Sequence, residues 1–296
     1  MPLHVQPVTP SFVCEFTGVD LRTDASPQLA QAVMEAMDRF GVSFFRGQSI
    51  GDEQQIAFSR LFGNLEQSPH FGRKTGETVR MKFPELFDVS NLDEQDRILQ
   101  DSDARRLYRA ANLMWHTDSS FQPGGAGYSL LSARVVPSFG SDTEFADMRA
   151  AYDDLPELMK RRLQGLVVEH STFHSRSLIG YRFTEDELKR RRPTLQHLVQ
   201  VHPRSGRRSL YLASHASHVV GMPLDEGRAL LKELTEHATQ PKYVHAHAWQ
   251  AGDLLIWDNR CTMHRATPYD DMKERRDLRR TTVIGDLPLV ETAAAA

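Results

Sequence analysis

Residues 252–264 read Gly-Asp-Leu-Leu-Ile-Trp-Asp-Asn-Arg-Cys-Thr-Met-His. Residues 254–257 form a short apolar run of strand length, and a polar turn follows directly at residues 258–260. This pattern predicts a buried strand that delivers His264 at the start of the next element. Residues 128–136 alternate and are partly apolar on both faces, which is typical of a second buried strand.

Similar patterns set the expected fold class. Apolar runs predict further strands at residues 42–45, 166–168, 198–201, 210–212, 244–249 and 281–284. Helical spacing is rarer and predicts helices at residues 30–40, 52–62, 156–163 and 224–239. Many strands with few helices indicate a mainly β fold, a sandwich or barrel covered by helices. Strands and helices do not alternate along the chain, and no glycine-rich phosphate loop follows a strand. The sequence therefore argues against a doubly wound nucleotide-binding fold.

The organisation of the chain favours one domain. Its 296 residues contain no internal repeat and no linker rich in Pro, Gly or Ser. We therefore predict a single domain over residues 1–296. Two stretches without regular pattern, residues 66–112 and 174–194, are predicted to be loops inserted into the core, and long loops of this kind commonly form lids or binding loops.

Charge and cysteine content limit the partners and the compartment. The formal net charge of −3 provides no basic surplus for nucleic acid. No apolar run approaches the roughly 20 residues of a membrane span, and the N-terminus does not resemble a signal peptide. The two cysteines suit a reducing compartment. We expect a cytoplasmic protein with neither nucleic acid nor membrane as partner.

A possible metal site stands at residues 115–118, Trp-His-Thr-Asp. On an extended segment residues i and i+2 point to the same side, so His116 and Asp118 can converge on one ion. One imidazole and one carboxylate are two of the three ligands that non-haem Fe(II) oxygenases use. The chain has 13 histidines, so one His-x-Asp arises easily by chance and decides nothing alone.

A cluster of arginines near the C-terminal end is a second candidate for chemistry. Four arginines lie within residues 275–280, beside the last predicted strand. A surface salt bridge explains any one of them, but the cluster predicts an anion site, because planar guanidinium groups bind carboxylates through two hydrogen bonds. His245 and His247 are predicted to be a partly exposed pair on a strand, and Cys261 a small packed residue.

Taken together, these motifs resemble the Fe(II)/2-oxoglutarate-dependent dioxygenases of the taurine dioxygenase type. Within that group the chain is most similar to the enzymes that cleave aryloxyalkanoate herbicides. The resemblance runs through nearly the whole chain, and the motifs that carry it are TGVDL at 17–21, FRGQ at 45–48, EQQIAF at 53–58, DVSN at 88–91, WHTDSSF at 115–121, DTEFADMRAAY at 142–152 and WDNR at 257–260.

The resemblance implies a double-stranded β-helix (jelly-roll) core and a set of site residues. The Fe(II) ligands would be His116, Asp118 and His264. Arg276 and Thr143 would hold the distal carboxylate of the co-substrate 2-oxoglutarate, and Trp257, also assigned to co-substrate binding, would line the pocket near the iron. Residues 140–143 read Gly-Ser-Asp-Thr where the family commonly has Gly-Gly-Asp-Thr, which puts the local turn geometry in question.

Three further residues would contact a small acidic substrate. Arg280 matches the family's second arginine, which usually binds the acidic group, and Asn112 would line the pocket near the iron. His215 falls where related herbicide enzymes place a substrate contact, in a short loop. The resemblance also suggests a homo-oligomer.

The expected reaction consumes O2 and 2-oxoglutarate and hydroxylates the carbon next to a heteroatom. An aryloxyalkanoate such as 2,4-dichlorophenoxyacetate would give a phenol, a 2-oxo acid, succinate and CO2. One alternative is the same chemistry on an alkylsulfonate such as taurine. Others are a jelly-roll that binds an acid without turnover, and a hydrolase that uses Zn²⁺ on the same three residues.

Overall fold

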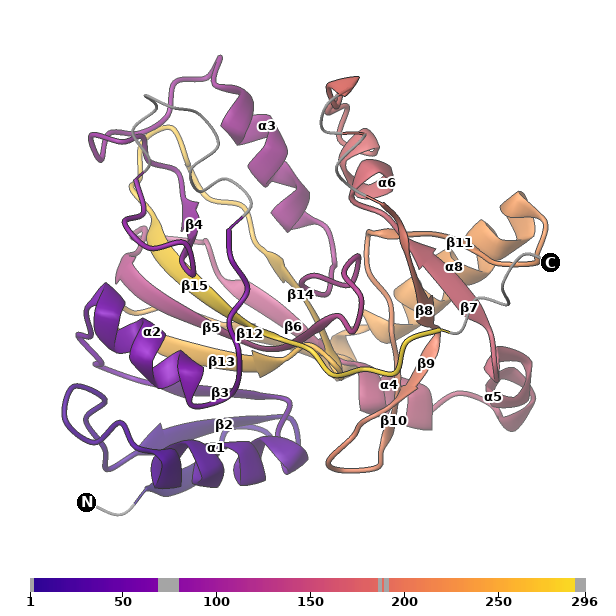
Figure 1. Ribbon diagram of the computed structural model, residues 1–296, viewed down its shortest axis with the longest axis horizontal. Helices are drawn as coiled ribbons and strands as arrows, with labels where there is room; N and C mark the ends of the chain where they lie inside the picture. The colour runs from indigo at the N-terminus through magenta and orange to yellow at the C-terminus, as the bar shows by residue number, and fades with distance from the viewer. Residues whose placement is uncertain (1–2, 69–79, 186–187, 189–191, 291–296) are drawn as a thin grey trace.

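The strand predicted at residues 254–257 lies in the middle of a seven-stranded sheet (Figure 1). It is β13 (Leu254–Asp258), and it pairs antiparallel with β3 (Val42–Phe45) on one side and β5 (Ala126–Val135) on the other. The computed structural model describes residues 3–68, 80–185, 188 and 192–290. The sheet has the order β1-β2-β3-β13-β5-β15-β4, and its other strands are β1 (His4–Pro7), β2 (Val13–Thr17), β15 (Asp277–Ile284) and β4 (Phe87–Ser90).

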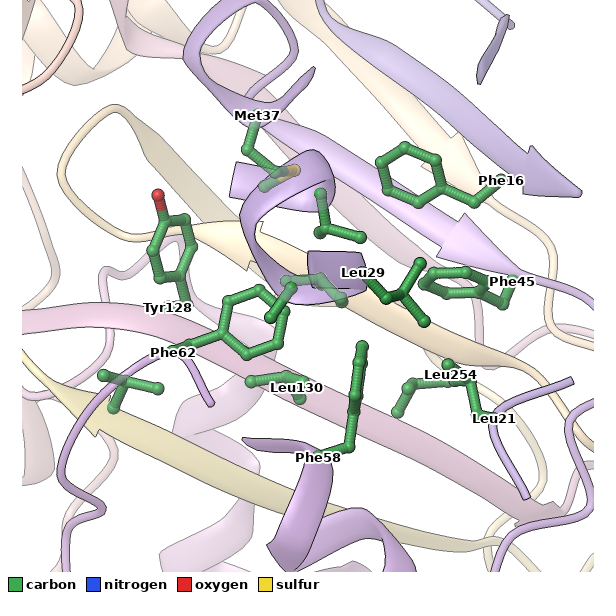
Figure 2. Packing of buried hydrophobic residues seen from close by; sticks show 14 of the residues in the cluster. Phe16, Leu21, Leu29, Met37, Phe45, Phe58, Phe62, Tyr128, Leu130 and Leu254 are labelled. Atoms are coloured by element: carbon green, nitrogen blue, oxygen red, sulfur yellow. The ribbon is translucent and has the colours of Figure 1, made fainter. Parts of the chain in front are cut away.

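The outer face of this sheet is covered by α1 (Pro27–Arg39) and α2 (Asp52–Arg60). Leu254 and Ile256 of β13 point to these helices and share a buried cluster with Met37 of α1 and Phe58 of α2 (Figure 2). Each large apolar side chain buried in this way contributes roughly 1.5–3 kcal/mol. The helix α1 begins where the Ser26 side chain accepts a hydrogen bond from the third residue after it.

The inner face of the same sheet meets a second sheet. Leu255 and Trp257 of β13 point inward and pack in one cluster with Phe145 of the facing sheet. That sheet has the order β12-β6-β14, from β12 (Val244–His247), β6 (Thr143–Asp147) and β14 (Thr262–Ala266). Two facing sheets around one apolar layer form a jelly-roll core. The predicted fold class, mainly β with covering helices, is confirmed.

A smaller part of the molecule lies beside this core, at the right of Figure 1. It contains a sheet of order β11-β7-β8, made of β11 (Ala216–Val219), β7 (Val167–His170) and β8 (Thr194–His197), and a pair formed by β9 (Val199–Val201) and β10 (Arg208–Leu210). The helix α8 (Leu224–Ala238) packs on β11 through a buried leucine stripe, and α5 (Glu157–Leu163) precedes β7.

The four predicted helices are present as α1, α2, α5 and α8, but within the described residues three further short helices were missed. These are α3 (Ala104–Ala110), α4 (Met148–Asp153) and α6 (Thr172–Ser177), each six or seven residues long. Fewer than two turns show no helical period in the sequence. The start of α4 is fixed by the Asp147 side chain, which accepts hydrogen bonds from the backbone N–H groups of Arg149 and Ala150.

The stretch 66–112 is more than the loop that we expected. It contributes the edge strand β4, the helix α3 and the 3₁₀ turn η1 (Ala111–Leu113), while a second such turn, η2 (Pro241–Tyr243), leads into β12. Residues 69–79 of this stretch, and 186–187 and 189–191 of the other, lie outside the described residues. The assignment of both stretches as lids in a single domain stays a prediction.

Two further expectations concern membrane spans and the cysteines. Among the described helices, none combines the length and the apolar character that crossing a bilayer requires. Cys14 and Cys261 are both buried and unpaired. Burial raises the pKa of the Cys261 thiol to about 12, so it packs as a small neutral residue, as predicted.

Candidate metal centre

Direct backbone pairing brings two of the predicted ligands together. The N–H of His116 donates to the carbonyl oxygen of His264 at 2.9 Å, and the N–H of His264 donates back at 2.8 Å. Residues opposite each other in such an antiparallel pair project their side chains to the same side. The two imidazole rings accordingly lie 4.2 Å apart between centroids.

Asp118 completes the group. The Nε2 atom of His116 lies 3.9 Å from Oδ1 of Asp118, and Nε2 of His264 lies 3.8 Å from Oδ2. One ligand atom from each of the three residues lies within 4.8 Å of the other two, and all three residues are buried. Two imidazole nitrogens and one carboxylate oxygen converging on one point are the donor set of a facial Fe(II) site.

The histidines are in the protonation state that a metal requires. Nδ1–H of His116 donates to the carbonyl oxygen of Met114 at 2.8 Å, which leaves the lone pair on Nε2, the atom that faces Asp118. Burial lowers the pKa of His116 and lowers that of His264 well below its usual value, so both rings are neutral near pH 7. A neutral imidazole is the form that binds a metal.

Asp118 is held by the strand β5 and by the turn that follows β13. Its Oδ2 accepts a hydrogen bond from the hydroxyl of Ser129 in β5 at 2.8 Å. Its backbone N–H donates to Oδ1 of Asn259 at 3.2 Å, and the same Asn259 oxygen accepts the indole N–H of Trp257 at 3.0 Å. Trp257 also packs on His264, with ring centroids 4.7 Å apart. These contacts orient the carboxylate before any ion binds.

Arg280 lies directly beside this carboxylate. It donates a short hydrogen bond to Oδ1 of Asp118, and its guanidinium group stacks over the Phe87 ring at 5.1 Å. Burial alone would raise the pKa of Asp118, but the neighbouring Arg280 charge outweighs it and lowers the pKa. Asp118 is therefore ionised, and a positive charge stands at the edge of the site.

Arg276 and Thr143, the residues predicted to hold the distal carboxylate of 2-oxoglutarate, are both buried. Arg276 is buried, its NH1 donates to the carbonyl oxygen of Val89 at 3.1 Å, and its Nε has no partner among the described residues. Burial lowers its pKa to about 10, which leaves the guanidinium cationic at neutral pH. A buried cation without an acidic partner is costly, and an anionic ligand relieves that cost. Thr143 is buried at the start of β6 and bonds to Trp249.

The structure also places the remaining predicted residues. His215 is buried with its ring 6.4 Å from that of His116 and 4.9 Å from that of Phe121, and its Nδ1 lies 2.8 Å from the hydroxyl of Ser175 in α6. It therefore belongs to the surroundings of the metal group. Asn112 is half-buried in η1, which packs against β14, the strand that carries His264.

Two features near the site were missed. Glu66 accepts the hydroxyl of Ser119 at 2.8 Å, one residue past Asp118, and burial raises the pKa of its carboxyl to about 7. The guanidinium of Arg176 in α6 stacks over the ring of Tyr108 in α3 at 4.3 Å. Tyr108 also contacts Tyr181 at 5.3 Å, so the two inserted stretches touch. No spacing in the sequence signals contacts between segments so far apart.

One histidine prediction is wrong. His247 is not partly exposed but buried, and its Nε2 lies 3.0 Å from Oδ2 of Asp253. The strand β12 turns this residue into the core, where its ring meets those of Phe44 and Trp249. His245, the other member of the pair, is half-buried as expected.

Comparison with known proteins shows which family this chain resembles over most of its length. Residues 4–282 match the family model of the taurine catabolism dioxygenase TauD, TfdA family. The chain is 45% identical to an alpha-ketoglutarate-dependent 2,4-dichlorophenoxyacetate dioxygenase of Burkholderia sp. (strain RASC), over 96% of this chain and 95% of that protein. It is 35% identical to an (S)-phenoxypropionate/alpha-ketoglutarate-dioxygenase of Sphingobium herbicidovorans, over 98% of both chains.

A solved structure is similar over the same length. The crystal structure of AAD-2 in complex with Mn(II) and N-oxalylglycine superposes with a TM-score of 0.90 at 43% identity. The superposition covers 99% of this chain and all of that one. The similarity thus extends to a protein crystallised with a divalent metal and a small dicarboxylate.

Proposed function

We propose that this chain, which belongs to the taurine catabolism dioxygenase TauD, TfdA family, hydroxylates the carbon beside the ether oxygen of a small aryloxyalkanoate. It is a 2-oxoglutarate-dependent dioxygenase that uses Fe(II), 2-oxoglutarate and O2. The observation that carries the proposal is the buried group of two histidines and one aspartate with Arg280 beside it. Identity of 45% to a 2,4-dichlorophenoxyacetate dioxygenase supports that substrate class.

In this proposal His116, Asp118 and His264 would hold the iron. Fe(II) bound there supplies the oxidising chemistry, in which 2-oxoglutarate becomes succinate and CO2 and one oxygen atom of O2 enters a C–H bond of the substrate. Ser129 and Asn259 keep the Asp118 carboxylate oriented through the hydrogen bonds described above.

In this proposal one arginine binds 2-oxoglutarate and another binds the substrate. Arg276 and Thr143 bind the distal carboxylate of 2-oxoglutarate, a charge-assisted contact of roughly 1.5–3 kcal/mol. Arg280 binds the carboxylate of the substrate at the edge of the metal group, while His215 and Asn112 line the pocket. Both anions are then fixed relative to the metal, which supplies the orientation that the reaction needs.

The products follow from the position of the new hydroxyl group. Hydroxylation of the carbon that bears the aryl ether oxygen gives a hemiacetal. Its C–O bond to the aryl oxygen breaks, the hydroxyl oxygen becomes a carbonyl, and the hydroxyl proton passes to the departing phenolate. The substrate is thereby split into a phenol and a 2-oxo acid.

A substrate panel tests this proposal. The purified protein, with Fe(II), ascorbate and 2-oxoglutarate, is given 2,4-dichlorophenoxyacetate, either enantiomer of a 2-aryloxypropionate, taurine, or no substrate. We expect release of succinate that depends on the aryloxyalkanoate and is matched mole for mole by the phenol. Succinate release that responds to taurine and ignores every aryloxyalkanoate would favour the sulfonate alternative and overturn the substrate proposal.

The alternatives to oxidative turnover, the cellular location and the oligomeric state are separate questions from the substrate. The dioxygenase names of the relatives favour oxidative turnover over a hydrolase or an acid-binding protein. We also propose a cytoplasmic location, which the two unpaired cysteines suit, and a homo-oligomer without a nucleic-acid or membrane partner. The oligomer rests on the family resemblance alone.

A further inference from the structure

We propose that Trp249 is a positioning residue for 2-oxoglutarate. Its indole N–H holds the Thr143 hydroxyl so that the hydrogen of this hydroxyl points to the distal carboxylate of the co-substrate. The inference rests on the role of Thr143 in the proposed function. It adds a residue that contacts neither acid and acts only through Thr143.

The direction of the hydrogen bond follows from the two groups. Nε1 of Trp249 lies 3.0 Å from Oγ1 of Thr143, and both side chains are buried. An indole nitrogen only donates, whereas a hydroxyl has one hydrogen and two lone pairs. Trp249 therefore occupies a lone pair of Thr143, and the hydroxyl hydrogen must point elsewhere. Thr143 is left as a donor, which is the form that a carboxylate needs.

Without Trp249 the hydroxyl could rotate. In some of its orientations a lone pair rather than the hydrogen would face the carboxylate, and two electron-rich oxygens repel each other. Fixing the rotation in advance lowers the free-energy cost of binding the anion. This is the same form of preorganisation that Ser129 and Asn259 provide for Asp118.

The position of Trp249 is itself fixed. Trp249 lies two residues past His247, which is the register partner of Thr143 between β12 and β6. The His247 ring packs edge-on against the Trp249 ring, with centroids 4.8 Å apart at 80°. His247 is held by Asp253, which also accepts the backbone N–H of Gln250 at 2.9 Å. The turn after β12 thus places the Trp249 indole beside Thr143.

A competing explanation is that Thr143 only satisfies a buried indole N–H. Such a role predicts that loss of the N–H changes stability but not the affinity for 2-oxoglutarate. The positioning role predicts a loss of affinity that exists only while Thr143 carries its hydroxyl. A double-mutant cycle separates the two.

The test measures binding without turnover. Calorimetry titrates 2-oxoglutarate into the Mn(II)-loaded protein and into its Trp249→Phe, Thr143→Val and doubly substituted forms. We expect each single substitution to raise the Kd about three- to tenfold, the loss of one hydrogen bond. In the Thr143→Val background, Trp249→Phe should raise it less than about twofold. An unchanged Kd in Trp249→Phe, or the same increase in both backgrounds, would overturn the inference.

Three controls narrow the interpretation. Binding of 2-oxobutyrate, which has the same 2-oxo acid end and no distal carboxylate, should not respond to Trp249→Phe. Tyr243 lies just before β12, and its hydroxyl donates a hydrogen bond to Asp154 at 2.8 Å. Tyr243→Phe removes this donor and should leave the Kd for 2-oxoglutarate unchanged. Trp249→Met, which also lacks an N–H, replaces Trp249→Phe if thermal melting shows that the latter does not fold.

The outcome also separates this inference from the proposed function. No oxidisable substrate takes part, so a failure with aryloxyalkanoates leaves the result standing. A wild-type protein that does not bind 2-oxoglutarate would overturn the proposed function and this inference together. Normal binding that ignores Trp249 would overturn the inference alone.

Discussion

At the scale of single residues, four neighbouring arginines have four different environments. Arg275 is exposed, and Arg279 pairs with a carboxylate of α2 at 2.6 Å. Arg280 donates to Asp118, while Arg276 is buried with a backbone carbonyl as its hydrogen-bond acceptor. The sequence predicted an anion site here, and this assignment stays a prediction. The sequence could not indicate which guanidinium groups are already paired, because their partners come from remote segments.

Burial of a single histidine makes the stability of the protein depend on pH. His170 is fully buried, and burial lowers the pKa of its imidazole from 6.5 to about 3. Between these two values the unfolded chain binds a proton that the folded chain does not. The free energy of unfolding therefore falls as the pH falls, by up to about 1.4 kcal/mol per pH unit from this residue.

His170→Asn tests this linkage, because asparagine can still reach the hydroxyl of Ser120, which lies 3.0 Å from Nδ1 of His170. Urea unfolding at several values between about pH 6 and pH 4 should show a pH slope lower by nearly one proton in the variant. The slopes of other buried histidines cancel in the comparison. Equal slopes in the two proteins would show that His170 is not held neutral.

At the scale of elements, periodic patterns were predictable and short or paired elements were not. The strand at residues 254–257 and the helices α1, α2 and α8 show clear apolar spacing, and the structure has them within a few residues of the expected bounds. The helices α3, α4 and α6 are too short to show a period. The i, i+2 spacing placed His116 beside Asp118, but the register that pairs His116 with His264 is a tertiary property.

The turn before β6 departs from the family's common sequence at a strained position. Ser141 has φ +61°, in the left-handed region, where an ordinary side chain costs roughly 1–2 kcal/mol. Glycine has no such cost, although its greater freedom in the unfolded chain offsets part of the gain. Ser141→Gly should therefore raise the free energy of unfolding by up to about 1 kcal/mol.

Chemical denaturation measures this change, with Gly140→Ala as the opposite control. Gly140 has φ +72°, and a Cβ there would lie 2.7 Å from the carbonyl oxygen of Pro268. The alanine variant should lose stability where the glycine variant gains it. A loss of stability in Ser141→Gly would mean that the serine side chain stabilises the turn.

At the scale of the whole molecule, the site is assembled from distant parts of the chain. The jelly-roll supplies Asp118, His116 and His264 between its sheets, and β15 supplies Arg280. The two inserted stretches meet through Tyr108 of α3 and α6, both near the top of Figure 1. A single sequence does not show which distant residues meet in the folded chain, so resemblance to a family was needed to select these residues.

If His116, Asp118 and His264 form one metal site, loss of one of them should abolish metal binding. The most direct test is equilibrium binding of Mn(II), followed by its EPR signal, to the wild-type protein, to His264→Ala and to His170→Asn. We expect one ion per chain in the wild type and in His170→Asn, and loss of this binding in His264→Ala, since a structural or catalytic ion needs all its ligands. Unchanged binding of Mn(II) by a folded His264→Ala variant would show that the three residues do not form one metal site.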